Sequence, residues 1–343
     1  MVACLLLGAM CHAVAAPAAK RPNVLFVMAD QMRFDAMGST TRGNIKTPGL
    51  DTLSKEGVRI EYSWTSTPTC TPARAAILTG QSPWNHGLIG AGEVAPVYAF
   101  EMPAAMAQAG YSTTSLGKDH FGWNATSNTG IQHGYESLQL FDGLGHCVNK
   151  SAPCGTNGAQ TDPGGNNWNG EFDDYDVWFR RQPGMAGKDP QATLDKTSDP
   201  SFDTDGWNGW HGRPYVYPEY LHPTAWVARH AVSFIENYSD DRPWFLKVSF
   251  HRPHSPYDPP ARVLESVSAA DLPPIITGGG QTQWDARYRD DGACGPQAAD
   301  AWCGLMPREN STLSRRAYYA SVRVDIIGHA RIRYVGKSQS CMV

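Results

Sequence analysis

The sequence predicts an α/β fold with a largely parallel central sheet, and three observations support this prediction. Residues 23–30 and 243–250 are short apolar runs rich in β-forming side chains, typical of strands buried on both faces of a parallel sheet. Residues 224–238 carry apolar side chains at helical spacing, as expected of a helix packed on such a sheet. With 343 residues, the chain is long enough for one large α/β domain or two smaller ones.

The N-terminal residues 1–16 are apolar and end in small residues, with Ala13-Val14-Ala15 as a cleavage site. This run is too short to cross a membrane, so we predict a signal peptide. No other segment of the sequence is long and apolar enough to be a membrane span. We therefore expect a secreted or lumenal protein.

Cysteine usage agrees with a secretory route, because two pairs of cysteines lie close together in the sequence. The simplest pairing is two short-loop disulfides, Cys147–Cys154 and Cys294–Cys303, which leaves Cys70 free and Cys341 unmatched. Four N-glycosylation tripeptides fit the same route. They begin at Asn124, Asn149, Asn237 and Asn310. The formal net charge of −4 gives no reason to expect a nucleic-acid partner.

The predicted strand 23–30 ends in Asp30-Gln31. Ligands of open α/β sheets bind at the carboxyl ends of the strands, and hard divalent cations take carboxylate and amide oxygens. A turn-forming aspartate is the alternative for Asp30. Residues 47–53 then predict a short helix, with Leu50 and Leu53 packed in the core.

A second predicted helix begins at Cys70. Pro72 suits a first helical turn because it has no N–H to satisfy, and Gly80 is a natural helix stop. Free N–H groups and the helix dipole favour an anion at Cys70, and Arg74 adds positive charge one turn later. A nucleophile in a cationic environment and a half-buried structural cysteine both fit this pattern.

Residues 111–116 predict a strand that runs into Lys118 and His120, which are bracketed by glycines. Glycines let backbone approach a ligand closely, although an exposed Lys-x-His is also typical of a solvated loop. Residues 130–220 show little regular periodicity and many aromatic side chains. We interpret them as ordered loops around a substrate pocket, with packing of these aromatics on the sheet as the alternative.

The helix predicted for residues 224–238 has Thr224 as its candidate N-cap. The strand 243–250 follows and runs straight into His251-Arg252-Pro253-His254-Ser255-Pro256. Two prolines make this turn stiff, which suits a positioned acid.

Several of these segments fit motifs of one enzyme family. The motifs C-x-P-x-R, G-K-x-H-x-G and H-x-P-H-x-P occur at residues 70–74, 117–122 and 251–256. Together with Asp30-Gln31 and the T-P-x-L-D-x-L segment at 47–53, they stand in the order found in formylglycine-dependent sulfatases. The chain resembles this family over roughly residues 22–319. The resemblance implies an alkaline-phosphatase-like three-layer sandwich.

The resemblance also implies a nucleophile and a metal. A formylglycine-generating enzyme would oxidise Cys70 to Cα-formylglycine, whose hydrated aldehyde attacks sulfur while Arg74 stabilises it. Asp30, Gln31 and Cys70 would be ligands of a divalent metal, Ca²⁺ or Mg²⁺.

The remaining site residues would bind the sulfate ester and move protons. The resemblance implies that Lys118 binds a sulfate oxygen and that His120 is the base that takes the proton of the second hydroxyl. His251 would contact the ester oxygen and protonate the leaving alcohol. We expect His254 to be structural or to lie beside the substrate rather than to be catalytic.

The chain departs from the family pattern after Val322. Residues 314–322 match a family helix that leads to a Ser-Asp-His-Gly or Ser-Asp-Asn-Gly turn with further metal ligands, but neither turn follows here. Asp325 and His329 do not have the spacing to replace it. We therefore expect a truncated chain that lacks the C-terminal part of the domain and the small C-terminal subdomain. Such a chain would expose a sheet edge and apolar surface.

These observations predict three parts of the chain and one reaction. The parts are a signal peptide at 1–16, an incomplete catalytic domain at 22–322 and a divergent tail at 323–343. The reaction is hydrolysis of an organic sulfate ester. A phosphodiesterase or phosphonate ester hydrolase on the same scaffold is one alternative, and a catalytically impaired relic is the other.

Overall fold

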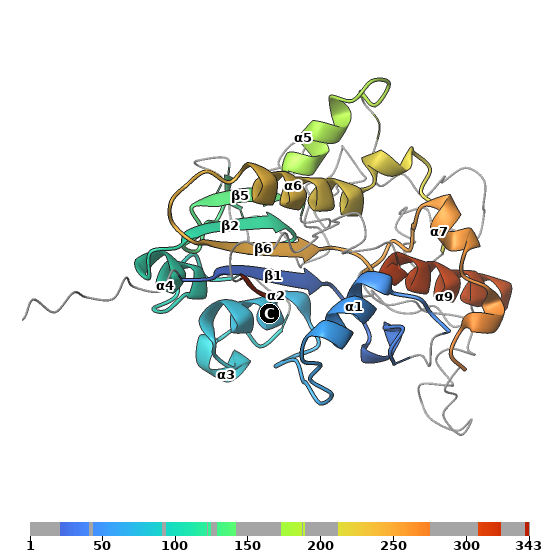
Figure 1. Ribbon diagram of the computed structural model, residues 1–343, viewed down its shortest axis with the longest axis horizontal. Helices are drawn as coiled ribbons and strands as arrows, with labels where there is room; N and C mark the ends of the chain where they lie inside the picture. The colour runs from blue at the N-terminus through green and yellow to red at the C-terminus, as the bar shows by residue number, and fades with distance from the viewer. Residues whose placement is uncertain are drawn as a thin grey trace, which may run out of the picture.

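The centre of the computed structural model is a parallel sheet with strand order β5-β2-β6-β1-β7 (Figure 1). The structure describes residues 21–40, 44–90, 94–121, 123–124, 129–141, 173–186, 188, 212–274, 308–323 and 340–342. The strands of the sheet are β1 (Asn23–Ala29), β2 (Ser112–Gly117), β5 (Ser137–Leu140), β6 (Trp244–Phe250) and β7 (Ser340–Met342). A separate antiparallel pair consists of β3 (Trp123–Asn124) and β4 (Thr129–Gly130).

Helices cover both faces of this sheet. The α-helices of the described residues are α1 (Pro48–Glu56), α2 (Cys70–Thr79), α3 (Pro83–His86), α4 (Met102–Gln108), α5 (Asp174–Arg180), α6 (Pro223–Asn237), α7 (Ala261–Glu265) and α9 (Arg308–Arg323), of which α7 and α9 lie beyond the carboxyl ends of the strands (Figure 1). Short 3-10 helices lie at Phe34–Ala36, Glu219–Leu221 and Ala269–Asp271. None of the helices in the described ranges is long and apolar enough to cross a bilayer.

Two hydrophobic cores define the three layers. On one face, Trp226 of α6 and Phe179 of α5 pack with Leu246 and Val248 of β6. On the other face, Leu78 of α2 lies in a cluster with Phe245 of the same strand. Strand β6 is therefore buried along its whole length, which explains why most of its side chains are apolar; Lys247 and Ser249 are the exceptions.

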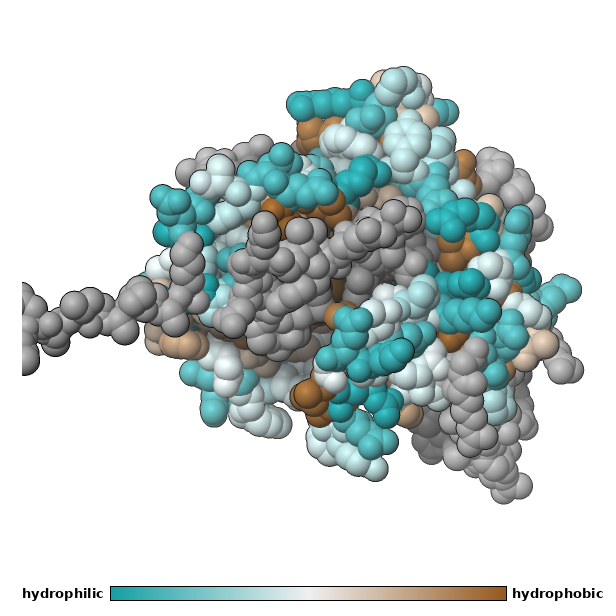
Figure 2. All heavy atoms as spheres, in the orientation of Figure 1, coloured by the Kyte–Doolittle hydropathy of each residue, from teal (hydrophilic) through white to brown (hydrophobic). Residues whose placement is uncertain are grey.

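A smaller cluster joins α7 and α9 to the loop after β1. Ala36 and Ile45 of that region pack with Val263 of α7 and Ala320 of α9. The described surface in Figure 2 is largely hydrophilic or of intermediate hydropathy, with apolar residues in separate small groups.

The α/β class, the parallel sheet and the two apolar strands are confirmed, but two local predictions are wrong. His222 caps α6, and its ring accepts the Thr224 N–H at 3.2 Å, so Thr224 is not the N-cap. No residue of α1 is fully buried, so Leu50 and Leu53 are half-buried rather than core positions.

The region predicted to be irregular contains two regular elements, β5 and α5. Both are short, so neither gives a long periodic signal in the sequence. Strand β7 pairs with β1 in parallel, with Leu25 opposite Met342, and is the edge strand of the sheet. The predicted signal peptide, the four cysteines predicted to form disulfides and most of the predicted tail lie outside the described residues.

Candidate active site

Three neighbouring strands end at the same edge of the sheet and bring polar residues together there. Asp30 directly follows β1, Lys118 follows β2 and His251 follows β6. These strands are adjacent in the order β2-β6-β1, so their carboxyl ends meet, as in other ligand sites of open α/β sheets.

Gly117 allows the turn from β2 into this edge. Its φ of +90° lies in the left-handed region, and a Cβ at this position would lie 2.0 Å from the Ser249 carbonyl oxygen. Only glycine fits such a close approach of two backbones.

Cys70 is the first residue of α2, as predicted. Thr69 before it is extended, and Gly80 ends the helix in a left-handed conformation. The Cys70 Sγ lies 3.6 Å and 3.8 Å from the two carboxylate oxygens of Asp30 and 4.0 Å from Lys118 Nζ. The sulfur therefore lies beside the Asp30 carboxylate, the Lys118 ammonium group and the N-terminus of α2.

Two buried cations hold the Asp30 carboxylate. Lys118 Nζ forms an ion pair with Asp30 Oδ2, and Arg74 Nη2 lies 3.3 Å from the same oxygen. Burial alone would raise the pKa of the Asp30 carboxyl, but Lys118 and Arg74 outweigh it, so this pKa lies well below its usual range. Asp30 is therefore ionised at any physiological pH.

Arg74 links α2 to the ends of three strands. Its Nη1 donates to the Lys118 carbonyl oxygen at 2.6 Å and to Ser249 Oγ at 3.1 Å, while its Nη2 faces Asp30. With 4% of its surface exposed, the guanidinium is a buried brace as well as a source of positive charge.

His120 lies in the same turn as Lys118 and has a left-handed backbone with φ of 57°. Burial, followed by the positive charges of Lys118 and Arg74, holds the pKa of its ring well below the usual range. The ring is neutral at physiological pH and so is able to accept a proton.

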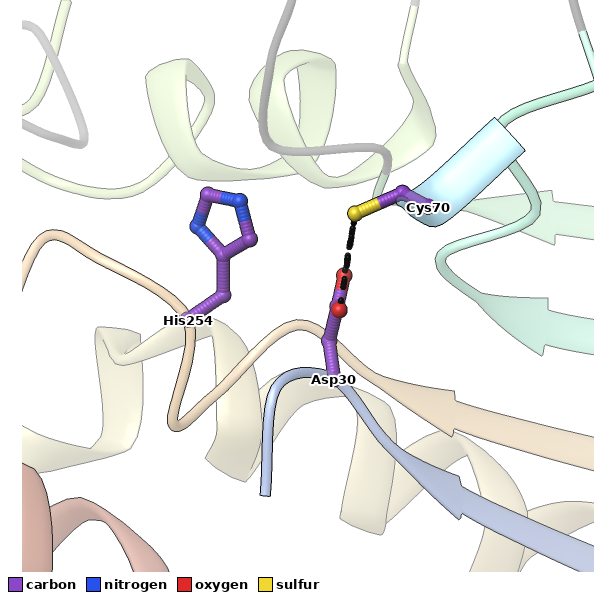
Figure 3. Close-up of side chains that lie close together, drawn as sticks. All are labelled: Asp30, Cys70 and His254. Carbon is purple, nitrogen blue, oxygen red and sulfur yellow. Dashed lines mark hydrogen bonds between the residues drawn. The ribbon is translucent and has the colours of Figure 1, made fainter. Parts of the chain in front are cut away.

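His254 lies closer to the sulfur than the sequence suggested. Asp30, Cys70 and His254 each offer a ligand atom, and these atoms lie within 4.8 Å of one another. Figure 3 shows the Asp30 and Cys70 side chains reaching toward each other, with the His254 ring facing the same space from the turn after β6. Burial and then Lys118 lower the pKa of His254 to about 4.

The two histidines of this turn have opposite tautomers. Arg252 Nη1 donates to His251 Nδ1 at 2.6 Å, and since a guanidinium has no lone pair to offer, the His251 proton resides on Nε2. His254 Nδ1 donates to the Ser255 carbonyl oxygen at 2.7 Å, which leaves the lone pair on its Nε2. Neither Nε2 has a hydrogen-bond partner within the described part of the chain. One ring is thus a hydrogen-bond donor and the other an acceptor.

The cluster fits a divalent cation. Asp30 supplies an ionised carboxylate, and His254 Nε2 is a buried acceptor without a partner among the described residues. A cation here would share Asp30 with Lys118 and Arg74. Gln31, the other predicted ligand, is exposed and has a left-handed backbone with φ of 54°, so its role stays a prediction.

Most of the predicted residues therefore lie at one edge of the sheet. Asp30, Cys70, Arg74 and Lys118 are in direct contact, and His254 completes the cluster around the sulfur. His254 was predicted to be structural or to lie beside the substrate, and its place among possible metal ligands was not predicted. Its place between two prolines directly after a buried strand was the available signal.

The match to a family model decides which family these residues represent. The model described as Sulfatase matches residues 22–274. The chain belongs to the sulfatase family.

Other sulfatases align with different shares of the chain. An arylsulfatase of Clostridium perfringens is 32% identical over 306 residues, which cover 88% of this chain and 56% of that enzyme. The steryl-sulfatase of Mus musculus is 35% identical over 133 residues, which cover 35% of this chain and 21% of that protein. The chain thus spans about half the length of the arylsulfatase that it matches over most of its own length.

A solved structure shows the same fold. The phosphonate monoester hydrolase of Agrobacterium radiobacter superposes with a TM-score of 0.63 at 19% identity, covering 91% of this sulfatase chain and 58% of the hydrolase. At this identity the likeness extends to the α/β architecture and its parallel sheet.

Proposed function

We propose that this chain hydrolyses sulfate esters at the edge of the sheet where Cys70 lies. The observation that carries the proposal is the position of the Cys70 sulfur, at a helix N-terminus, 4.0 Å from Lys118 Nζ and beside the ionised Asp30. Positive charge at a nucleophile is what an anionic ester requires, because it offsets the repulsion between the ester and the attacking group. The family match supports the same reaction.

We also propose that a formylglycine-generating enzyme modifies Cys70, so that the Sγ in this structure stands for the formylglycine oxygens. The modified residue would supply a hydrated aldehyde as nucleophile. A divalent metal, Ca²⁺ or Mg²⁺, would be held by oxygen atoms of Asp30, residue 70 and Gln31, and would polarise oxygen atoms bound to it. The maturation step fits the predicted secretory route of the chain.

The protein's own residues then have distinct tasks. Lys118 and the N-terminus of α2 bind the anionic sulfuryl oxygens, and Arg74 keeps Lys118 and Asp30 in register through its contacts to both. His251 presents Nε2–H as a donor for the leaving oxygen, in keeping with its predicted role. The neutral His120 is the base for the step that regenerates the nucleophile.

The test compares three esters of one alcohol. The full chain is produced together with a formylglycine-generating enzyme, and hydrolysis of the sulfate, phosphate and phosphonate esters of 4-nitrophenol is followed by absorbance. We expect the sulfate ester to have the highest kcat/KM. We expect Cys70→Ala to lower it by at least about 10³-fold, because removal of a nucleophile that acts with its neighbours as a unit abolishes most of the catalysis.

A mass spectrum of the tryptic peptide from Ile60 to Arg74 reports whether Cys70 carries the aldehyde. If the aldehyde is present and a phosphonate or phosphate ester reacts faster, the alternative hydrolase is correct. If the aldehyde is present and none of the esters reacts, the chain is a catalytically impaired relic. A chain with an unmodified thiol that still hydrolyses the sulfate ester at the same rate would contradict the proposed nucleophile.

A further inference from the structure

The Lys118–His120 turn is anchored from below by a side chain that the proposed reaction does not use. Asp119 lies between the two site residues, but its carboxylate is 2% exposed and points into the sheet. Its Oδ1 accepts hydrogen bonds from Ser115 Oγ and Lys247 Nζ, both at 2.6 Å. The turn therefore presents alternate residues to the site and to the interior.

Lys247 reaches Asp119 from the middle of the buried strand β6. In the sheet it lies directly beside Ser115 of β2, so both partners of Asp119 come from one register position. Its ammonium lies 4.8 Å from the centre of the Phe121 ring and 5.9 Å from that of Tyr135. Two aromatic faces and one carboxylate thus surround the buried cation.

Stability alone does not account for this pair. Burying two charges costs several kcal/mol of desolvation, and well-packed apolar side chains of similar volume are often neutral or stabilising replacements. The turn above the pair also carries a cost, because His120 adopts φ of 57°, a conformation that L side chains rarely adopt. A directional contact beneath the turn can hold such a conformation where an apolar contact would let it relax.

We propose that the buried Asp119–Lys247 ion pair is a positioning device for catalysis, which holds the turn so that Lys118 and His120 face residue 70. The inference rests on the proposed sulfate ester hydrolysis. It assigns Asp119 and Lys247 no contact with the substrate; they act through the residues on either side of Asp119. Lys118 is fixed from the other side by Asp30 and by Arg74, which binds its carbonyl oxygen.

The test separates positioning from stability with four variants. Asp119→Asn and Lys247→Met each break the pair, and Asp119→Leu/Lys247→Met replaces both charges with apolar side chains. Arg242→Met, which removes an exposed ion pair to Glu136 at 2.8 Å, is the matched control. We measure kcat and KM for the sulfate ester, together with Tm.

We expect each single variant to lower kcat by at least about tenfold, because small misplacements of catalytic groups act on the chemical step. KM should rise as well, since Lys118 also binds the ester. The double apolar variant should regain most of the wild-type Tm and keep the low kcat. Arg242→Met should leave both kinetic constants unchanged. Recovery of kcat together with Tm in the double variant, or an unchanged kcat in the single variants, would overturn the inference.

A second measurement keeps this inference separate from the proposed function. If the wild-type chain does not hydrolyse sulfate esters, the proposed function fails, and the rise of Tm with inorganic sulfate becomes the readout of the site. We expect a rise in the wild type that the double apolar variant loses. An equal rise in both proteins, or no rise in the wild type, would overturn the positioning role.

Discussion

At the scale of single residues, the two histidines after β6 are distinguished by the atoms that bind their Nδ1. Arg252 donates to His251 and thereby fixes the proton on Nε2, whereas the Ser255 carbonyl oxygen accepts from His254 and leaves its Nε2 bare. Both rings are buried, and burial followed by the charge of Lys118 lowers the pKa of each. In the neutral state one ring can give a hydrogen bond to a leaving group and the other can receive one or bind a cation.

This difference predicts that substitutions at His251 and His254 change the dependence of kcat/KM on the leaving group in different ways. In His251→Leu, loss of the Nε2–H donor should lower kcat/KM about 10²-fold for a poorly leaving alkyl sulfate and much less for a 4-nitrophenyl sulfate, because a good leaving group needs little help. In His254→Gln, the loss should be similar for the two esters. A set of sulfate esters with alcohols of graded acidity provides the measurement.

Phe141, which packs against the His251 ring at 5.5 Å between centres, offers a control. Phe141→Leu should disturb packing and leave the dependence on leaving group as it is in the wild type. If His254→Gln instead shows the steeper dependence on the leaving group, the donor role belongs to His254.

At the scale of elements, a buried ion pair ties the turn after β6 to the start of α6. Arg252 donates to both carboxylate oxygens of Asp258, at 2.5 Å and 2.8 Å, and both side chains are 1% exposed. His222, which caps α6, lies with its Nε2 3.2 Å from the Asp258 carbonyl oxygen. The turn that carries the two histidines is thereby fixed on the sheet and on the helix layer.

This pair predicts a stability that depends on pH. Burial alone would raise the pKa of the Asp258 carboxyl. The opposing effect of Arg252 and His222 is larger, so the folded-state pKa lies below the usual 3.8. The stabilisation is complete above the unfolded-state pKa and is lost as the pH falls through it toward the folded-state pKa. Asp258→Asn should lower the free energy of unfolding by about 3–5 kcal/mol near neutral pH, because it leaves Arg252 buried without its partner charge.

Urea unfolding at about pH 7 and about pH 3 measures this effect. The difference in the free energy of unfolding between the wild type and Asp258→Asn should be smaller at the lower pH. Asp240→Asn, which alters an exposed ion pair with Arg242, should behave like the wild type at both pH values. If the free energies of unfolding of the wild type and Asp258→Asn differ by the same amount at both pH values, the charge of Asp258 is not what stabilises the turn.

Some helices and strands could be predicted from the sequence, whereas some of their caps and contacts could not. The strands β1 and β6 were predictable because each is rich in apolar and β-forming side chains, and α2 was predictable because proline and glycine mark its ends. The α6 cap was not, since histidine is an unusual capping residue and Thr224 has the more common chemistry. Contacts such as Asp119–Lys247 join residues 128 positions apart, so no local pattern announces them.

At the scale of the whole molecule, the sequence predicted which residues form the site but not all of the contacts that they make. Motifs at strand ends predicted which residues would meet, because parallel strands end at one edge of a sheet. They did not predict that Arg74 is a brace for Lys118 and Ser249, or that His254 lies in the cluster around Cys70. Both facts depend on side-chain directions that the folded backbone sets.

One surface feature bears on how the molecule behaves in solution. Four apolar side chains alternate with polar ones in the stretch between α1 and α2, and each is mostly exposed. They are Val58 (94%), Ile60 (74%), Tyr62 (74%) and Trp64 (84%). Alternating, exposed apolar stretches favour pairing with another chain, and contiguous apolar surface lowers solubility.

The double substitution Ile60→Thr/Trp64→Ser should therefore reduce self-association without weakening the fold. Substitutions at exposed positions usually change the free energy of unfolding by about 0.5 kcal/mol or less, so Tm should stay close to that of the wild type. Light scattering over a concentration series measures the association. Leu246→Thr, at a fully buried position of β6, is the matched polar change and should lower Tm strongly. If the surface variant lowers Tm as much as Leu246→Thr does, the stretch 58–64 contributes to folding stability in solution, and its exposed side chains have partners there.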